Sequence, residues 1–368
     1  MSMLSGLRVL EVAGGLVDLG GRMLAELGAE VLSIVPAGPE RPHAETLAWH
    51  HGKTRIAADD IDPDALRRLL AGADILLDDR RRGDLGLDTL AADNPGLIHV
   101  VARPFSADGP YAGRRATDLT LMALSGLMTI VGEPDRPPLK LPGEQAYALT
   151  GIQAATAALM GLRARRRTGR GQRIDLSALQ SATLANYREA IMYEWTGRIG
   201  FRTGNKLVRG KSGVRQVWPC ADGFVTWSMI DNPSMMRSLV RVMAGEGAAG
   251  ELTEIQWDHI LVADEDQGTI ERWQSVFGAF FASHTKAELA AWSLEHGWGL
   301  SVISDLEDVR QSDHLASRGL FVDVEDEETS TRVRLPGPLF RHGAGEDTPP
   351  RRLSRPIPIS QAAWSDRS

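Results

Sequence analysis

The first hundred residues alternate between short apolar runs and amphipathic stretches. The run at residues 7–15, LRVLEVAGG, ends in two glycines and is typical of a buried strand. Residues 20–30 then show helical spacing, and the run at 31–35, VLSIV, predicts a second strand. The same pattern predicts a helix over 62–73 and strands over 74–79 and 96–102. This alternation predicts an α/β protein with a parallel sheet, in which ligands bind at the carboxyl ends of the strands.

The second half of the chain reads as helices and hairpins. An Ala-rich helix is predicted over 148–169, and the glycine-rich, basic stretch 202–213, RTGNKLVRGKSG, predicts a loop. Further predicted elements are hairpins over 217–229 and 318–337 and helices over 234–245, 269–284 and 285–297, the last with Thr285 and Glu288 as a capping box. The chain is too long for one simple core, so its change of character near residue 200 predicts two lobes.

One acidic residue stands where a polar approach becomes an apolar helix. Arg114 and Arg115 lead to Asp118, and from Leu119 the apolar residues recur at helical spacing. Aspartate is a favoured N-cap because its carboxylate accepts hydrogen bonds from the free N–H groups of the first helical turn. A capped carboxylate stays ionised, as a nucleophilic carboxylate must. The local pattern therefore predicts a helix cap, a reactive carboxylate or both.

Charge and composition limit the ligands that the protein could bind and the cellular compartment in which we expect it. The net charge of −7 argues against nonspecific binding to nucleic acid or to anionic membranes. The single cysteine, Cys220, excludes an intrachain disulfide and a multi-cysteine metal site. Arg8 and Glu11 interrupt the first apolar stretch, which makes it a poor signal-peptide core, and we find no apolar run long enough for a bilayer. We therefore expect a cytoplasmic protein.

Several common catalytic motifs are missing from the sequence. The glycines at 14–15 and 20–21 do not have the G-x-G-x-x-G spacing of a dinucleotide site, and no phosphate-binding P-loop is present. We find no G-x-S-x-G nucleophile elbow and no H-E-x-x-H pattern among the nine histidines. We therefore expect no metal site and no permanently bound cofactor.

Five segments, in the same order, resemble the class III CoA-transferases, the carnitine and bile-acid CoA-transferase group that includes formyl-CoA transferase-like enzymes. The segments are GLRVLEVAGG…LAELGAEVLSIV, ADGPYAGRRATDLTLMALSGLM, GIQAATAALMGLRARRRTGRGQRIDLS, VWPCADGFV and LFVDVEDEETSTRVRLPGPL. The resemblance implies a Rossmann-like large domain, a smaller α+β domain and an interlocked homodimer. It places the N-terminal part of the large domain at 1–190, a linker and the small domain at 191–320, and a segment returning to the large domain at 321–368.

The resemblance also implies a reaction. Asp118 would attack an acyl-CoA thioester to give a mixed anhydride, and the CoA thiolate would return to make an aspartyl-CoA thioester. A carboxylic acid acceptor would then take over CoA through a second mixed anhydride. Acyl-CoA and the acid are thus expected as substrates.

Other residues are assigned by the same resemblance. It implies CoA contacts at Gly15, Leu16, Lys53, Arg55, Arg80 and Arg81, and an active-site loop containing Gly204, Lys206, Gly210 and Gly213 that shields the anhydride from water. Solvated charges on loops are an equally good interpretation of the basic residues. The segments that correspond to the family's nucleotide-binding segments, HHGKTRI and DDRRRGDLG, also differ from the family pattern.

Two other functions remain open on the sequence. A racemase of the α-methylacyl-CoA type needs a His directly before the acid, where this chain has Thr117. A catalytically degenerate subunit that pairs with an active paralogue would explain the altered nucleotide-binding segments. No pattern in the sequence specifies the acyl donor or the acceptor acid.

Overall fold

The computed structural model describes residues 2–36, 42–59, 61–79, 85–337 and 352–366. The chain divides into two compact units. Unit 1 is Met1–Thr129, Leu139–Gly200 and Asp313–Ser368, and unit 2 is Ile130–Pro138 and Phe201–Ser312. Unit 1 is therefore built from both ends of the chain. The boundaries at 190 and 320 inferred from the sequence stay a prediction about independently folding domains.

Unit 1 contains a six-stranded parallel sheet with the order β3-β2-β1-β4-β5-β6. Its strands are β1 (Arg8–Val12), β2 (Glu30–Val35), β3 (Thr54–Ala57), β4 (Ile75–Asp79), β5 (Ile98–Arg103) and β6 (Gln172–Ser177). The strand order reverses between β1 and β4, which makes the carboxyl ends of these two strands the topological switch point. The predicted α/β class with a parallel sheet is confirmed.

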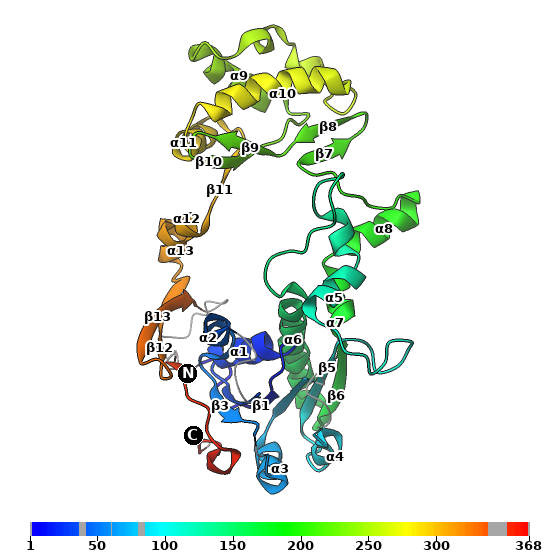
Figure 1. Ribbon diagram of the computed structural model, residues 1–368, viewed down its shortest axis with the longest axis vertical. Helices are drawn as coiled ribbons and strands as arrows, with labels where there is room; N and C mark the ends of the chain where they lie inside the picture. Colours follow the sequence, from blue (N-terminus) through cyan, green and yellow to red (C-terminus); the bar gives the residue numbers. More distant parts are fainter. Residues whose placement is uncertain (1, 37–41, 60, 80–84, 338–351, 367–368) are drawn as a thin grey trace. The chain divides into compact units, whose positions relative to one another are not determined.

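Helices cover both faces of this sheet (Figure 1). The helices of this part of the chain are α1 (Asp18–Glu26), α2 (His43–His50), α3 (Pro63–Gly72), α4 (Leu87–Ala92), α5 (Asp118–Leu124), α6 (Gln145–Thr168), α7 (Ala178–Leu184) and α8 (Tyr187–Thr196), with a 3-10 turn at Leu127–Ile130; α8 has no buried residue and does not cover the sheet. Leu10 and Val12 of β1 share a core with α3 and α4. Strand side chains alternate between faces, so Glu11 points to the other face, where α1 and α6 lie.

Helices α1 and α6 approach each other closely through glycines. A Cβ atom on Gly20 would lie only 2.6 Å from the backbone oxygen of Gly151, and one on Gly151 would lie 2.9 Å from the Cβ atom of Leu19. Neither glycine could carry a side chain without moving the helices apart. The two helices therefore form a layer in backbone contact above the Glu11 face of the sheet.

The C-terminal part of the chain completes unit 1. It contains α13 (Asp313–Ser317), β12 (Phe321–Asp326), β13 (Thr331–Pro336), β14 (Arg352–Leu353) and a 3-10 turn at Ile359–Gln361. Strands β12 and β13 form the predicted hairpin, and β14 pairs in parallel with β12. Ile357 makes a parallel bridge to Ile56 of β3. The last described residues therefore close the outer edge of the six-stranded sheet.

Unit 2 has two small sheets covered by helices. Its elements are β7 (Lys206–Arg209), β8 (Ser212–Arg215), β9 (Val217–Cys220), β10 (Gly223–Thr226), β11 (Ser301–Ile303), α9 (Pro233–Gly245), α10 (Gln267–Ala282), α11 (Lys286–His296) and α12 (Leu306–Gln311), with 3-10 turns at Gly250–Glu254 and Trp257–His259. Tryptophans dominate its core: Trp218, Trp227, Trp257, Trp273 and Trp298 are all buried. The β9–β10 hairpin and the capping box of Thr285 and Glu288 are confirmed.

The predicted loop at 202–213 is wrong, because most of it is a hairpin. Strands β7 and β8 pair antiparallel from Lys206↔Arg215 to Arg209↔Ser212. Gly210 has a φ of 58° at the first position of the two-residue turn, a backbone conformation suited to glycine. Val214 supplies a buried side chain to the core of unit 2. Glycines and basic residues thus mark the turn and the exposed face of a strand pair.

Among the described residues, no helix is both long and apolar enough to cross a membrane.

Candidate active site

Asp118 is the first residue of α5 and not its N-cap. The N-cap is Thr117, whose Oγ1 accepts a hydrogen bond of 3.3 Å from the backbone N–H of Thr120. Thr117 therefore takes the capping role that the sequence offered to Asp118. The Asp118 side chain is left to make contacts outside its own helix, and it is only 7% exposed.

The Asp118 carboxylate caps a different helix. Its Oδ1 accepts hydrogen bonds from the backbone N–H groups of Ala146, at 2.8 Å, and Tyr147, at 3.3 Å, in the first turn of α6. The side chain of Glu144, at the N-cap position of α6, does not cap this helix. Asp118 thus satisfies two of the free N–H groups of a 24-residue helix that begins almost 30 residues later, and it meets the positive end of that helix dipole.

The second oxygen of Asp118 faces a lysine. Lys140 Nζ lies 3.1 Å from Oδ2, and the Lys140 side chain is 30% exposed. Oδ2 is buried but accepts no well-aligned hydrogen bond in the structure, so the contact is an ion pair. Lys140 also donates to the backbone oxygens of Leu141, at 3.2 Å, and Gly143. One oxygen is therefore fixed by the backbone, and the other is held by a side chain that reaches solvent.

Gly15 and Leu16 lie at the switch point, in the loop between β1 and α1. The N–H groups of Gly14 and Gly15 donate to Oδ1 of Asp18, at 3.1 and 3.0 Å, and the N–H of Leu16 donates to Oδ2 of Asp79, at 2.7 Å. The loop therefore stands where an open α/β sheet binds ligands. Its three N–H groups are already hydrogen-bonded to carboxylates, so these groups hold the loop in shape.

Lys53 lies beneath this loop, directly before β3. Its Nζ is 2.7 and 2.9 Å from the two carboxylate oxygens of Glu11 and 2.7 Å from the backbone oxygen of Asp18. Burial raises the pKa of Glu11 to about 7, against the lowering effect of Lys53. The sequence places Lys53 among the CoA contacts, but in this structure a phosphate could reach its ammonium only by displacing one of these partners.

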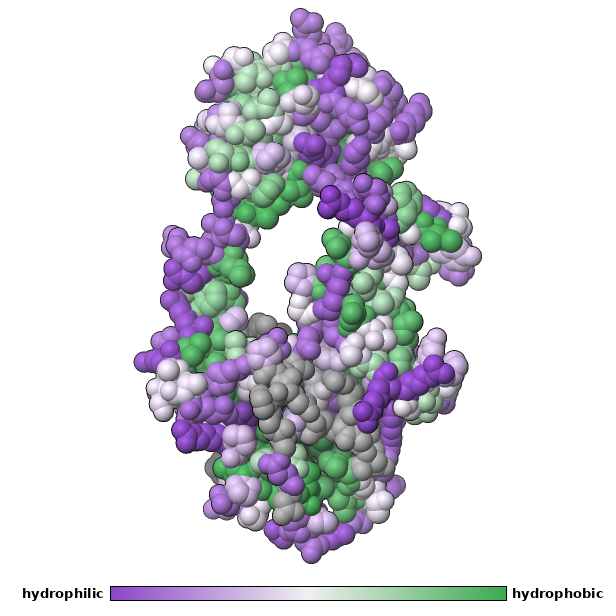
Figure 2. Space-filling view, in the orientation of Figure 1, coloured by the Kyte–Doolittle hydropathy of each residue, from purple (hydrophilic) through white to green (hydrophobic). Residues whose placement is uncertain are grey.

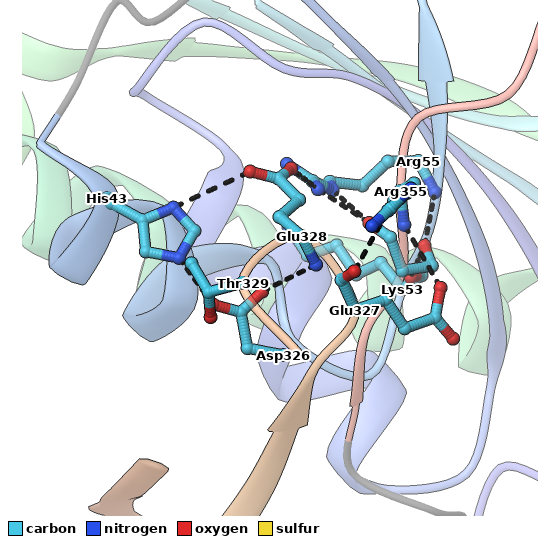
Figure 3. A network of polar contacts seen from close by, with 9 residues as sticks. His43, Lys53, Arg55, Asp326, Glu327, Glu328, Thr329 and Arg355 are labelled. Atoms are coloured by element: carbon cyan, nitrogen blue, oxygen red, sulfur yellow. Dashed lines mark hydrogen bonds and ion pairs between the residues drawn. The ribbon is translucent and has the colours of Figure 1, made fainter. Parts of the chain in front are cut away.

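Arg55 points to the C-terminal segment. Its guanidinium donates to the backbone oxygen of Ser354, with Nε at 2.8 Å, and it forms an ion pair with Glu328 (Figure 3). His43 lies 2.6 Å from Asp326 Oδ2 in the same network. Arg55 therefore fastens the β12–β13 turn and the last residues to β3. Arg80 and Arg81, the other predicted CoA contacts, lie outside the described residues.

The four predicted loop residues lie in unit 2, on or beside the β7–β8 hairpin. Lys206 pairs with Glu271 at 3.5 Å, and the N–H of Gly213 donates to Gln267 at 2.8 Å. Gly204 and Gly210 are in tight turns: a Cβ atom would lie 2.1 Å from Glu133 Oε2 at Gly204 and 2.2 Å from the Ala263 oxygen at Gly210. Asp118 belongs to unit 1, so an approach of these residues to it stays a prediction.

Three possible metal ligands also lie together in unit 1. The ligand atoms of Asp78, Asp88 and His99 are all within 4.8 Å of one another. His99 Nε2 contacts Asp78 Oδ2 at 3.0 Å, and Arg173 pairs with Asp88. Partners within the chain therefore offset part of the charge of this group, and we assign no metal to it.

The sequence did not predict the ion-pair partner of Asp118 or that of Lys53. Lys140 follows a Pro-rich turn and is separated from Asp118 along the chain, so no local pattern pairs the two residues. Glu11 did carry a signal, because an acid inside a buried strand needs a partner of opposite charge. The sequence did not indicate that Lys53 is that partner.

Comparison with known proteins shows clear similarity over almost the whole chain. The sequence model of CoA-transferase family III matches residues 4–358. The chain is 30% identical to succinate–glutarate CoA-transferase of Agrobacterium fabrum, over 96% of this chain and 92% of that protein. It is 27% identical to succinyl-CoA:(R)-benzylsuccinate CoA-transferase subunit BbsE of Thauera aromatica, over 92% of this chain and 88% of that protein.

A solved structure has the same fold. The crystal structure of a CAIB/BAIF family protein from Brucella suis matches with a TM-score of 0.79, at 24% sequence identity, and the match covers 96% of each chain. At this identity the match bears on the fold alone.

Proposed function

The chain belongs to CoA-transferase family III, and from this premise we propose that it moves CoA from an acyl-CoA donor to a carboxylic acid. Acyl-CoA is then a substrate and not a permanently bound cofactor. Succinyl-CoA is the first donor to test, because both named relatives carry succinate or succinyl-CoA in their names. The observation that carries a covalent route is the unequal holding of the two Asp118 oxygens.

In this route Oδ2 of Asp118 attacks the thioester carbonyl, the C–S bond breaks, and CoA leaves as its thiolate. The thiolate then attacks the Asp118 carbonyl of the mixed anhydride and releases the first acid as a carboxylate, which leaves an aspartyl-CoA thioester. The acceptor carboxylate attacks this thioester and expels the thiolate again. The thiolate finally attacks the acceptor carbonyl, which yields the new acyl-CoA and restores the Asp118 carboxylate. Dividing the transfer in this way makes each step easier.

The contacts of Asp118 suit this division of work between its oxygens. Oδ1 becomes the carbonyl oxygen of each intermediate, and the N–H groups of Ala146 and Tyr147 would stabilise the charge that develops on it. Oδ2 makes the bond, which requires that Lys140 move away. Because the Lys140 side chain is partly exposed, it can turn towards solvent or towards the carboxylate of a bound acid.

A second candidate is a subunit that supports CoA transfer while a partner chain supplies the nucleophile. The specific observation in its favour is that both Asp118 oxygens have partners, so the residue is complete as a cap of α6. The relative from Thauera aromatica is itself named as a subunit. A racemase is less well supported, since Thr117, at the position of the expected base, already serves as the N-cap of α5.

An apolar surface on unit 1 supports the proposal of a dimer. Helix α8 has no buried residue, and Figure 2 shows hydrophobic surface over it. Exposed apolar side chains on α8, just beyond it and on the helices before it are Leu119, Leu124, Ile152, Leu159, Met160, Leu184, Tyr187, Ile191, Tyr193, Trp195 and Ile199. So many exposed apolar residues on successive helices are typical of an interface. We propose that a second copy or a paralogue covers them.

We also propose that the segment 204–213 shields the anhydride, as the resemblance implies. The hairpin has backbone contacts to residue 263, which hold it against the body of unit 2. Proteolytic cleavage within the segment should then raise acyl-CoA hydrolysis relative to transfer. An unchanged ratio of hydrolysis to transfer after cleavage would count against the shield.

The first test is chemical trapping at Asp118. The purified protein is incubated with succinyl-CoA and a panel of other acyl-CoAs, hydroxylamine is added, and peptides are analysed by mass spectrometry. A hydroxamate on Asp118 would establish the covalent route and identify the donor class. An unmodified Asp118 in a protein that transfers CoA only after a partner is added would establish the supporting subunit. Asp118→Asn is the control for modification at other residues.

A further inference from the structure

The loop at the switch point is held by a buried polar network that the reaction does not use. The network joins β1, β2, the first turn of α1 and the residue before β3. Glu11 and Ser33 face each other on neighbouring strands, and Ser33 Oγ donates to Glu11 Oε1 at 2.6 Å. Glu11 is completely buried and Lys53 is 3% exposed. A charged pair at this depth persists only when its hydrogen bonds are satisfied.

Lys53 uses all of its hydrogen-bonding capacity within this network. An ammonium group has three N–H donors and no acceptor. Three oxygens lie within 2.9 Å of Lys53 Nζ: Oε1 and Oε2 of Glu11 and the backbone oxygen of Asp18. No N–H is left for a phosphate oxygen while these contacts persist.

The contact to Asp18 connects Lys53 to the loop. Lys53 fixes the backbone of Asp18 at the start of α1, and the carboxylate of the same residue accepts the N–H groups of Gly14 and Gly15. His50 Nε2 lies 3.4 Å from the other carboxylate oxygen of Asp18, and burial lowers the pKa of His50. Asp18 therefore connects Lys53 to the loop: its backbone oxygen binds Lys53, and its carboxylate binds the loop amides.

Helix α1 has a glycine, Gly21, where it packs against Glu11 and Lys53. A Cβ atom on Gly21 of α1 would lie 1.6 Å from Glu11 Oε2 and 3.2 Å from Lys53 Nζ. Only a glycine leaves space for the carboxylate, so α1 can lie directly on the ion pair. Without that space, Glu11 could not reach Lys53 and Ser33 in the observed geometry.

We propose that Lys53, paired with Glu11, is a positioning residue that holds the Gly14–Leu16 loop in the conformation that receives acyl-CoA, and that it acts through Asp18 without touching the ligand. The identity of the ligand rests on the proposed function; the hold on the loop does not. Loss of the pair frees the Asp18 backbone and then the loop amides. The loop becomes mobile, and CoA binds more weakly because binding must order it.

The test uses two matched double variants of the full chain. Glu11→Gln/Lys53→Met removes the buried pair as a unit, so no unpaired charge is left in the core. Glu26→Gln/Arg22→Met removes a second buried ion pair, both of whose residues are in α1 and whose nitrogen and oxygen are 2.8 Å apart. Arg22 also donates to the backbone oxygens of Ala48, Pro336 and Gly337, and the pair makes no contact with the loop among the described residues. The second variant therefore reports what the loss of a buried ion pair elsewhere in unit 1, away from the loop, does to exchange and binding.

The first readout is hydrogen exchange without ligand. At the amides of Gly14 and Gly15, exchange should be about tenfold faster in Glu11→Gln/Lys53→Met than in the unaltered protein, and unchanged in the matched variant. Equal exchange rates in all three proteins would overturn the hold on the loop. This readout needs no activity, so it stands whether or not the protein transfers CoA.

The second readout is the dissociation constant for free CoA, measured by isothermal titration calorimetry. The Lys53 variant should bind CoA about tenfold more weakly, and the Arg22 variant should bind it as the unaltered protein does. Unchanged binding in the Lys53 variant, or equal weakening in both variants, would overturn the inference alone. An unaltered protein that does not bind CoA would overturn both the proposed function and the loop's role in binding.

Discussion

Unit 1 contains two carboxylate–lysine pairs that differ in burial and in the partners of their carboxylate oxygens. Glu11 and Lys53 are sealed between the sheet and α1, and neither side chain is exposed. Asp118 and Lys140 lie at the start of α6, where the lysine side chain is 30% exposed. Glu11 is held through both oxygens by one lysine, whereas Asp118 divides its oxygens between backbone N–H groups and a lysine.

The difference shows how burial separates a structural pair from a pair that can react. A sealed ion pair cannot open without leaving a charge in the core, so it fixes geometry. A partly exposed lysine can turn to solvent and leave its partner at a smaller cost, so the carboxylate beside it can form a new bond. The conformation of the loop at the switch point thus depends on the first pair, and the proposed chemistry depends on the second.

The largest effect we expect is on the proposed nucleophile. Asp118→Asn keeps an oxygen for the N–H groups of Ala146 and Tyr147 but cannot form the anhydride, so CoA transfer should fall roughly a thousandfold or more. The measurement is the rate of CoA transfer from succinyl-CoA to added acids. The thermal midpoint serves as the control for folding. Unimpaired transfer with a lowered midpoint would make Asp118 a cap only.

The two lysines should differ in their effect on stability. Lys53→Met leaves Glu11 buried without its partner and should lower the free energy of unfolding by roughly 3–5 kcal/mol. Lys140→Met leaves one buried oxygen of Asp118 without its partner while the other stays hydrogen-bonded to the backbone, and should lower the free energy of unfolding by about 1–2 kcal/mol. Urea unfolding of the two variants measures both values. Equal losses would remove the distinction between a sealed pair and an open one.

The buried acid should also give the protein a measurable pH dependence. The pKa of Glu11 is raised from 4.5 to about 7, so the folded state binds this proton more tightly than the unfolded state does. Binding of this proton to Glu11 contributes at most roughly 3 kcal/mol to the free energy of unfolding. This contribution is fully present below pH 4.5 and is lost as the pH rises through 7. We expect Glu11→Gln to flatten the difference in unfolding free energy between pH 5 and pH 8. A slope unchanged by the substitution would contradict this assignment.

Among changes at the buried Glu11–Lys53 pair, the smallest change in unfolding free energy that we expect comes from Gly21, which leaves space for the pair. Gly21→Ala places a Cβ atom where the Glu11 carboxylate lies and should cost about 1–3 kcal/mol of unfolding free energy. Gly245→Ala at the end of α9 is the control, because nothing lies within 4 Å of a Cβ atom there, and it should stabilise by about 0.5 kcal/mol. If both substitutions stabilised the protein, the contact between α1 and the pair would be looser than the structure shows.

The sequence predicted the parts of the fold that follow local periodicity. The predicted strands at 7–15, 31–35, 74–79 and 96–102, the predicted helices at 20–30 and 62–73 and the hairpin at 217–229 appear where apolar spacing and turn residues placed them. The α2, β3 and α4 elements in the same part of the chain were not predicted. The β7–β8 hairpin was not predicted, because its glycines and basic residues are typical of a loop and its strands contain few apolar residues. Leu207 and Val208 precede the Gly210 turn and Val214 follows it, which is the pattern of a short strand pair.

The contacts of the candidate site could be predicted only in part. The pattern singled out Asp118 as a possible helix cap, but the helix it caps is α6, because Thr117 already caps α5. The family resemblance placed Lys53 among the CoA contacts, and the alternative was a solvated charge on a loop. Its partner Glu11 lies 42 residues away on another strand, and such pairings arise only when the sheet forms.

The closure of β3 by the C-terminal segment has a consequence for how the protein is made. Arg55 is bound by Ser354, which follows it by 299 residues, and Ile56 is bridged by Ile357. A ribosome adds about 5–20 residues per second, so this edge of the sheet stays open for roughly 15–60 s while unit 2 is synthesised and can fold. Unit 1 therefore finishes folding only after residues 352–357 have been synthesised, and a nascent chain halted before residue 352 leaves the outer edge of β3 open to chaperones and to other chains.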